Sequence, residues 1–132
     1  MTASILAQKI SSAKVSYLLG NSTIPSYLPA NNSLVYNTSV MTRNKITLII
    51  NPDDIEMGGE VGVGNLEYEW YDAIIDEETN TVIGKELIAN AGNSNTYVVN
   101  NGDRKIIPVV KNNYNGSIYT LQLGLIDIDD RA

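Results

Sequence analysis

The segment Leu66–Asp72, LEYEWYD, constrains the fold most, because it alternates like a β-strand and carries the only tryptophan, Trp70. Successive side chains of a strand point to opposite faces, so Leu66, Tyr68 and Trp70 share one face. The other face is mostly acidic. One face is therefore expected to be buried, and the sequence predicts a sheet that packs against a second layer across Trp70.

A second strong strand pattern is Lys45–Ile50, the richest β-branched run of the chain, in which alternate residues again share a face. We expect this strand in the sheet opposite Trp70. Near the C-terminus, Asn115-Gly116 lies between two alternating segments, which predicts a hairpin with a two-residue turn. The predicted core consists of Trp70, Tyr68, Leu66, Ile46, Leu48, Ile50, Val110 and Leu121.

Strand patterns and turn signals recur every eight to twelve residues after residue 32, which is typical of an all-β sandwich. Residues 76–80, DEETN, are predicted to form a hairpin tip, and Asn101-Gly102 a turn. The glycine-rich residues 56–65 are expected to be a flexible crossing. A phosphate-binding loop is the alternative for this segment, but the Gly-Lys-Ser/Thr of such a loop is missing.

Residues 1–32 are predicted to form an N-terminal arm and linker, followed by a sandwich domain at residues 33–132. Residues 3–13 have rough helical spacing, the next few alternate like a strand, and two prolines then break regular structure. The alternative is that this region folds back as an extra strand. The candidate partner-binding side chains of the arm are Ile5, Leu6, Ile10, Tyr17 and Leu19.

The composition argues against several classes of function. The net charge of −6 and the scattered basic residues argue against nucleic-acid binding. Without cysteine or histidine, the chain lacks disulfides, thiolate ligands and the usual general base. No apolar run is long enough to predict a membrane span or a secretory signal. We therefore expect synthesis and retention in a cytoplasm, unless the chain is a fragment of a longer exported protein.

Two groups of carboxylates are candidates for a catalytic pair or a metal site. Calcium requires six to eight converging oxygen ligands, and neither group has the spacing of a calcium loop. As a glycosidase pair they lack supporting groups, and most surface carboxylates are simply solvated. We therefore expect no catalytic residue, no metal and no cofactor. The groups are Asp53, Asp54, Glu56 and Glu60, and Asp127, Asp129 and Asp130.

A set of motifs resembles the immunoglobulin-like domains of bacterial surface proteins and tailed-phage virion proteins. The motifs are YEWYD, Gly84, NSNTYVV, Asn101-Gly102-Asp103 and VVKNNYNG, and the resemblance covers about residues 33–128. It implies an immunoglobulin-like antiparallel β-sandwich. Ile106 stands where such domains have a tyrosine corner and Pro108 where they have a second cysteine, so neither feature carries over. Pro108 also lacks an N–H, which predicts an edge strand or a bulge.

The resemblance implies a non-enzymatic structural or binding protein. The first hypothesis is a decoration subunit of a phage virion, bound through the arm to a capsid or tail protein and presenting loops toward cell-surface glycans. The second is a carbohydrate-binding or spacer module of a bacterial cell-surface or secreted protein. A hydrolase is a third and weaker hypothesis. Tyrosines that were considered as sugar-stacking platforms are Tyr17, Tyr27, Tyr36, Tyr71 and Tyr114.

Overall fold

A computed structural model describes residues 10–20, 22–36, 45–58, 62–100 and 103–130. These residues form twelve strands and two short 3₁₀ turns, with no α-helix. The elements are β1 (Ile10–Ser12), β2 (Val15–Leu19), β3 (Ser26–Tyr27), β4 (Ser33–Tyr36), β5 (Lys45–Ile50), η1 (Pro52–Asp54), β6 (Glu56–Met57), β7 (Asn65–Asp76), β8 (Thr81–Leu87), η2 (Ala89–Ala91), β9 (Thr96–Asn100), β10 (Arg104–Tyr114), β11 (Ser117–Gln122) and β12 (Ile126–Asp130).

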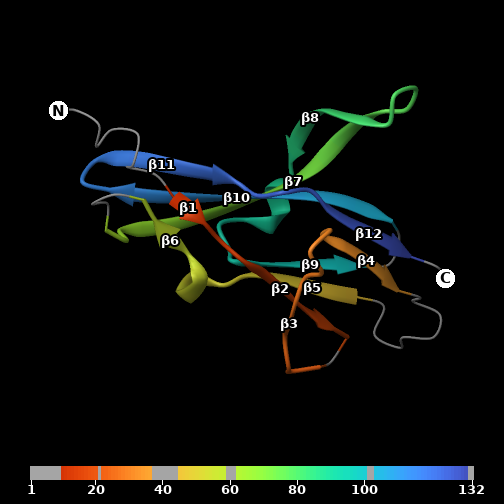
Figure 1. The fold of residues 1–132 in the computed structure, drawn as a ribbon, viewed down its shortest axis with the longest axis horizontal. Coiled ribbons are helices and arrows are strands. Elements are labelled where there is room, and N and C mark those ends of the chain that lie inside the picture. The colour runs from red at the N-terminus through yellow and green to blue at the C-terminus, as the bar shows by residue number, and fades with distance from the viewer. Residues whose placement is uncertain (1–9, 21, 37–44, 59–61, 101–102, 131–132) are drawn as a thin grey trace.

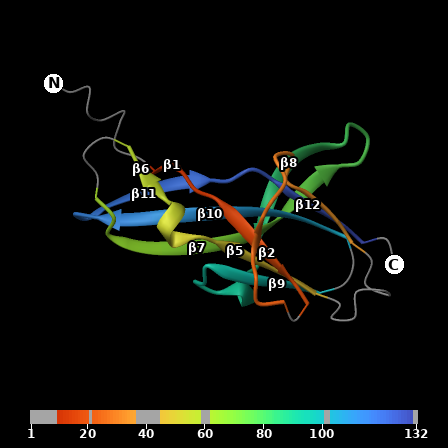
Figure 2. The ribbon, with the colours of Figure 1, turned by 60° about the horizontal axis from the view of Figure 1, so that its bottom comes forward.

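The strands form two main sheets that pack against each other (Figures 1 and 2). The larger sheet has the order β4-β12-β10-β7-β8, and β11 pairs with β10 beyond the end of β12. The second sheet has the order β3-β2-β5-β9, and β1 pairs with β6 in a small separate ladder. All pairs are antiparallel except β4 with β12. The predicted all-β sandwich is confirmed.

The core lies between the two sheets and follows from the registers of their strands. In the larger sheet, Trp70 of β7 lies opposite Pro108 of β10, and Tyr68 opposite Val110, so these side chains share the inner face. The second sheet contributes alternate residues of β5. The buried cluster comprises Ile10, Leu34, Ile46, Leu48, Ile50, Ile55, Trp70, Val99, Ile106, Val110, Ile126 and Ile128.

Trp70 is 0% exposed, and two contacts fix its side chain. One comes from β9 of the second sheet and the other from the segment that precedes β9. Its indole N–H donates to the Ser94 carbonyl at 2.8 Å, and its ring lies 5.8 Å from the Tyr97 ring in a stacked arrangement. Burial of the indole thus leaves no unpaired donor. Of the other predicted core residues, Ile46, Leu48, Ile50 and Val110 are fully buried, and Leu66, Tyr68 and Leu121 pack against them partly buried.

The structure corrects the predicted N-terminal arm. Residues 10–12 form a strand, not part of a helix, and Ile10 is buried in the core. All of β2 pairs with β5, from Val15↔Ile50 to Leu19↔Ile46, so Tyr17 and Leu19 belong to the sandwich. The alternative of an added strand therefore describes this region, because its alternating side chains are buried against the core. Ile5 and Leu6 lie outside the described residues.

Two other expectations about strands need correction. β9 pairs with β5 and β10 pairs with β7, so these two consecutive strands belong to different sheets and do not pair with each other. The turn geometry of Asn101-Gly102 lies outside the described residues. The C-terminal acidic segment is a strand, β12, which was not predicted. The expected flexible crossing begins with β6, which pairs with β1.

Pro108 is neither at an edge nor in a bulge but in the central strand β10. Its carbonyl accepts from the Leu123 N–H at 2.9 Å, so its backbone faces away from β7. On that side β10 pairs with β12 up to Ile106 and with β11 from Val109 onward. Pro108 therefore lies where one neighbour replaces the other, and its missing N–H interrupts no ladder.

Asn112 is the one buried side-chain amide among the described residues, and the sequence patterns did not single it out. Its Oδ1 accepts from the Gly64 N–H at 2.8 Å, and its Nδ2 donates to the Gly62 carbonyl at 3.0 Å. Gly64 lies so close to β10 that an added Cβ would be 2.2 Å from the Asn113 carbonyl oxygen. Asn112 thus holds the glycine-rich segment against the end of the sheet.

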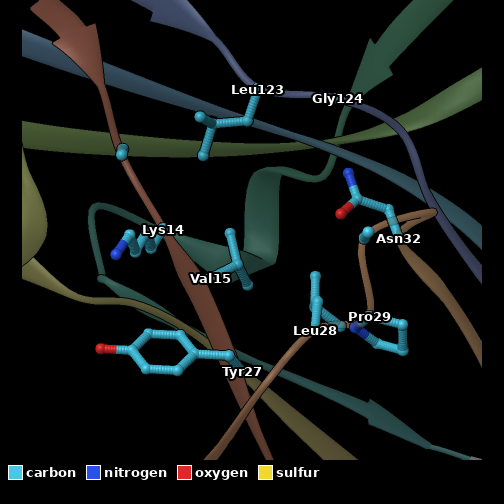
Figure 3. Close-up of a pocket in the computed structure, with 10 residues that line it drawn as sticks. Lys14, Val15, Tyr27, Leu28, Pro29, Asn32, Leu123 and Gly124 are labelled. Carbon is cyan, nitrogen blue, oxygen red and sulfur yellow. The ribbon is translucent and has the colours of Figure 1, made fainter.

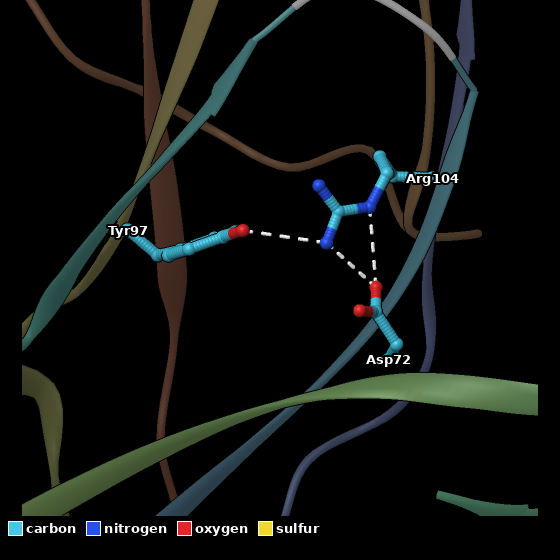
Figure 4. A network of polar contacts seen from close by, with 3 residues as sticks. All are labelled: Asp72, Tyr97 and Arg104. Atoms are coloured by element: carbon cyan, nitrogen blue, oxygen red, sulfur yellow. Dashed lines mark hydrogen bonds and ion pairs between the residues drawn. The ribbon is translucent and has the colours of Figure 1, made fainter. Parts of the chain in front are cut away.

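A polar network joins the two sheets beside Trp70 (Figure 4). Arg104 of β10 donates to Asp72 Oδ1 of β7 from Nη2 at 2.7 Å and from Nε at 3.1 Å. The same Nη2 donates to the Tyr97 hydroxyl of β9 at 3.3 Å. Hydrogen bonds to Asp72 and to the Tyr97 hydroxyl raise the pKa of Arg104, although burial opposes this, so the guanidinium stays charged.

We expect Trp70→Ala to lower the free energy of unfolding by about 3 to 5 kcal/mol, as for other large-to-small changes in a packed core. The cause is a cavity between the sheets and the loss of the Ser94 and Tyr97 contacts. Urea unfolding measures the change. Val98→Ala, at an exposed position of β9, is the control, and an unchanged midpoint for Trp70→Ala would contradict the observed burial.

We expect Arg104→Met to lower the free energy of unfolding by about 1 kcal/mol, because methionine keeps much of the apolar stem but loses a half-exposed ion pair. In the Arg104→Met background, Asp72→Asn should lower the free energy of unfolding by little more. A double-mutant cycle by urea unfolding measures this coupling. Strictly additive effects of the two changes would show that the pair does not act as a unit.

Candidate binding surfaces

An open groove of about 410 Å³ lies at one edge of the sandwich and is shown in Figure 3. Three segments that are distant in sequence form it: the start of β2, the connection from β3 to β4, and the connection from β11 to β12. We call it the Tyr27 groove. Its lining residues are Ala13, Lys14, Val15, Tyr27, Leu28, Pro29, Ala30, Asn32, Leu123 and Gly124.

Backbone hydrogen bonds hold the walls of the groove in place. The Leu28 N–H donates to the Val15 carbonyl at 3.2 Å, and the Asn32 N–H donates to the Pro29 carbonyl at 2.9 Å. The Asn32 carbonyl in turn accepts from Asp127 of β12 at 2.9 Å. Asn32 has a positive φ of 55°, which asparagine tolerates better than most residues. The groove is therefore built on both sheets.

Tyr27 is the exposed aromatic side chain of the groove, with 59% of its surface accessible. Its hydroxyl donates to Asp54 Oδ2 at 2.8 Å, and the Lys14 ammonium lies 5.5 Å from the ring centroid, within range of a cation–π contact. The hydrogen bond to Asp54, followed by the charge of that carboxylate and by burial, raises the pKa of Tyr27. The ring is thus held in one position by its polar end.

The groove has few polar side chains, and they provide both hydrogen-bond donors and an acceptor. The Asn32 side-chain amide makes no hydrogen bond to another described residue, so both its donor and its acceptor are available. Lys14 makes no ion pair within the described part of the chain. Apart from these two residues and Tyr27, the lining is apolar, with alanine, valine, leucine and proline side chains and Gly124. This is the composition of a small-molecule site, although an open one.

The other tyrosines considered as stacking platforms do not form a row with Tyr27. Tyr17 is half-buried against the core, and Tyr114 is half-buried beside Gly62. Tyr71 donates to Glu69 at 2.8 Å and has Lys85 over its ring at 5.0 Å. The Tyr36 side chain lies outside the described residues. Tyr27 is therefore the one of the five that the structure places in a groove.

The carboxylates considered for calcium do not converge where they are described. No group of three or more histidine, cysteine, aspartate or glutamate side chains that could hold a metal occurs among those residues. Asp54 binds Tyr27, and Asp127 pairs with Lys105 at 3.3 Å. Glu60 and the side chain of Asp130 lie outside the described residues.

A second surface is the β7–β8 ribbon, which we define as residues 73–87. It extends away from the two stacked sheets in both views (Figures 1 and 2). β8 is the terminal strand of the larger sheet. Ile83 is 65% exposed, and Ile74, Val82 and Leu87 are also exposed. Four large apolar side chains on one short ribbon form an unusual concentration of exposed hydrophobic surface.

The free edge of β8 also presents backbone groups. The Ile88 N–H donates to the Trp70 carbonyl at 2.8 Å, and bonded and non-bonded positions alternate in an antiparallel ladder. Lys85 and Leu87 therefore direct their N–H and C=O groups away from β7. The register shifts between Ile74↔Gly84 and Ile75↔Val82, which leaves Ile83 as the extra residue of a β-bulge.

The ribbon carries a negative charge at its tip. Asp76, Glu77 and Glu78 follow one another at the turn, and Glu86 lies nearer the sandwich. Lys85 is the one basic residue between residues 73 and 87. The ribbon thus combines apolar side chains, an open strand edge and an acidic tip.

The neighbouring outer face of the larger sheet is covered by the protein's own polar side chains. Ile107 and Val109 point outward there but are buried. Glu69 accepts from the Tyr71 hydroxyl and pairs with Lys111 at 3.2 Å, so these side chains lie across the sheet. The Tyr71 hydrogen bond lowers the pKa of Glu69 most, with Lys111 adding to it. On this face the apolar residues of β10 are thus buried beneath polar side chains, whereas the apolar side chains of the ribbon are exposed.

Comparison with known proteins gives no indication of the function. No family model, curated protein or solved structure matches the chain. Within the described residues, no helix has the length and apolar character needed to cross a membrane.

We expect Tyr27 to ionise above the ordinary tyrosine pKa of 10.0, and Asp54→Asn to bring its pKa back toward that value. Because the folded-state pKa is the higher one, the contribution to stability is present below pH 10 and is lost as the pH rises through the folded pKa. Tyrosine ¹³Cζ chemical shifts measure the titration. Glu69→Gln, which removes the equivalent contact of Tyr71, is the control, and it should leave Tyr27 unchanged.

Proposed function

We propose that this protein is a non-enzymatic binding subunit that attaches through its β7–β8 ribbon to another protein, as an auxiliary or decoration subunit on the surface of a virus particle. The observation that carries the proposal is the ribbon itself. An exposed apolar strand edge is a template for pairing with another chain, and natural proteins rarely leave one uncovered.

The chemistry of the ribbon specifies its partner. The side chains of Ile83 and Val82 require an apolar surface, and the outward backbone groups of Lys85 and Leu87 can hydrogen-bond to a partner strand. The acidic tip favours basic residues at the rim of that surface. The partner is thus a protein with an exposed strand and a positively charged border.

The attachment point differs from that expected from the sequence. Ile10, Tyr17 and Leu19 are engaged in the protein's own sandwich, so they are not available to hold a shell protein. The ribbon replaces them as the anchor. A decoration subunit needs only a modest contact for each copy, because many copies bind a shell whose sites repeat by symmetry.

Particle binding tests the proposal. Particles of the virus whose genome encodes this chain, produced without the chain, are incubated with the purified chain and banded on a density gradient. We expect the wild-type chain to band with the particles. Ile83→Gln should weaken this binding by about tenfold or more, because burial of an isoleucine contributes on the order of 1.5 to 3 kcal/mol.

Ile118→Gln is the matched control, because Ile118 is 63% exposed on β11, away from the ribbon. It should bind like wild type. Failure of the wild-type chain to band with particles would contradict the virion assignment, and equal losses for the two variants would contradict the ribbon as the anchor.

A further inference from the structure

The Tyr27 groove and the ribbon lie at opposite edges of the sandwich. β3, which carries Tyr27, is the terminal strand at one edge of the second sheet, and the segment after it leads into β4 and β12 of the larger sheet. β8 is the terminal strand at the other edge of the larger sheet, next to β7. Trp70 of β7 stacks on Tyr97 of β9, so this edge lies near β9, at the end of the second sheet that is opposite β3. A ligand of the groove is therefore independent of the proposed docking of the ribbon.

We infer that the Tyr27 groove binds an uncharged saccharide chain. The groove has the volume of a small-molecule site, and its exposed aromatic ring lies beside leucine and proline side chains. A sugar ring has an apolar face of C–H groups and a rim of hydroxyls. The apolar face suits the Tyr27 ring, and the hydroxyl rim suits the nearby polar groups.

The polar groups favour hydroxyls over ions. Asn32 offers one acceptor and two donors, and Lys14 offers three donors. A hydroxyl both donates and accepts, so one class of ligand satisfies them all. Figure 3 shows the Asn32 amide and the Tyr27 ring on different walls of the same hollow.

The charges near the groove do not favour a polyanion. The Lys14 ammonium lies over the Tyr27 ring, but the Asp54 carboxylate binds the hydroxyl of that same ring. The chain as a whole carries a net charge of −6. An acidic polysaccharide would gain attraction to one ammonium and meet repulsion from Asp54 and from the rest of the surface.

Asp54 acts as a positioning residue in this site. By accepting from the Tyr27 hydroxyl at 2.8 Å, it fixes the plane of an otherwise exposed ring. A ring held in place before the ligand arrives loses less conformational entropy on binding. Asp54 lies in η1, which leads into β6, so its position depends on the fold and not on the groove alone.

Titration of the full chain with defined oligosaccharides tests the inference. The probes are the uncharged hexasaccharides of glucose, N-acetylglucosamine, galactose and mannose, with hexagalacturonate as the acidic comparison. Two-dimensional NMR follows the Asn32 side-chain amide and the Tyr27 ring. We expect at least one uncharged probe to shift both sets of signals, and hexagalacturonate to bind more weakly than that probe.

Substitutions separate stacking from other contacts. Tyr27→Ala should weaken binding by about tenfold, and Tyr27→Phe should weaken it less, because the ring remains but its hydrogen bond to Asp54 is lost. Ile24→Ala is the matched control, since Ile24 is 79% exposed near Tyr27 but does not line the groove. Well-dispersed spectra of each variant establish that it is folded.

Three results would overturn the inference: no response to any uncharged probe, equal or tighter binding of hexagalacturonate, or binding that Tyr27→Ala leaves unchanged. None of these results bears on the particle-binding experiment, which depends on Ile83. Conversely, loss of particle binding in the Ile83→Gln variant leaves the saccharide titration as it is.

Discussion

The burial of Trp70 between the two sheets is the interaction on which the rest of the structure depends. A buried indole needs a partner for its N–H, and Ser94 supplies one from the segment that precedes β9. This contact places Tyr97 on the Trp70 ring, and the Tyr97 hydroxyl then accepts from Arg104, which binds Asp72. One buried side chain thus fixes how the sheets are aligned, both through apolar packing and through the polar network at its border.

Sequence reasoning found the elements whose signals are local. These signals, which depend only on neighbouring residues, are the alternation around Trp70, the β-branched run at Ile46 and the hairpin at Asn115-Gly116. Asn115 and Gly116 both have positive φ angles, as expected for the two-residue turn of such a hairpin. Sequence reasoning recognised the strand pattern of β2 but left open whether this strand joins the sandwich. A five-residue alternation reveals nothing about its partner β5, which begins 26 residues after β2 ends. Sequence reasoning missed β12, whose acidic residues alternate with the buried Ile126 and Ile128.

Neither candidate binding surface could be fully predicted from the sequence, for two different reasons. The Tyr27 groove combines three segments whose proximity comes from the stacking of the sheets, so no spacing along the chain indicates it. The ribbon was partly visible, because the hairpin tip at residues 76–80 was predicted. Its exposed character was not, since Ile74, Val82 and Ile83 have the composition of a buried strand. Only the arrangement in space shows that the two strands extend past the opposing sheet (Figure 1).

The details of β8 are compatible with the proposed docking, because they leave the edge open but disfavour pairing between two copies of the chain. A bulge at Ile83 bends the strand, and Lys85 and Glu86 put charges beside the free backbone groups. Both features disfavour the flat, extended pairing that leads to aggregation. The acidic tip adds repulsion between two copies, because their tips carry the same charge. The proposed partner with a basic border would meet attraction at the same place, so the features that oppose self-pairing would favour a different protein.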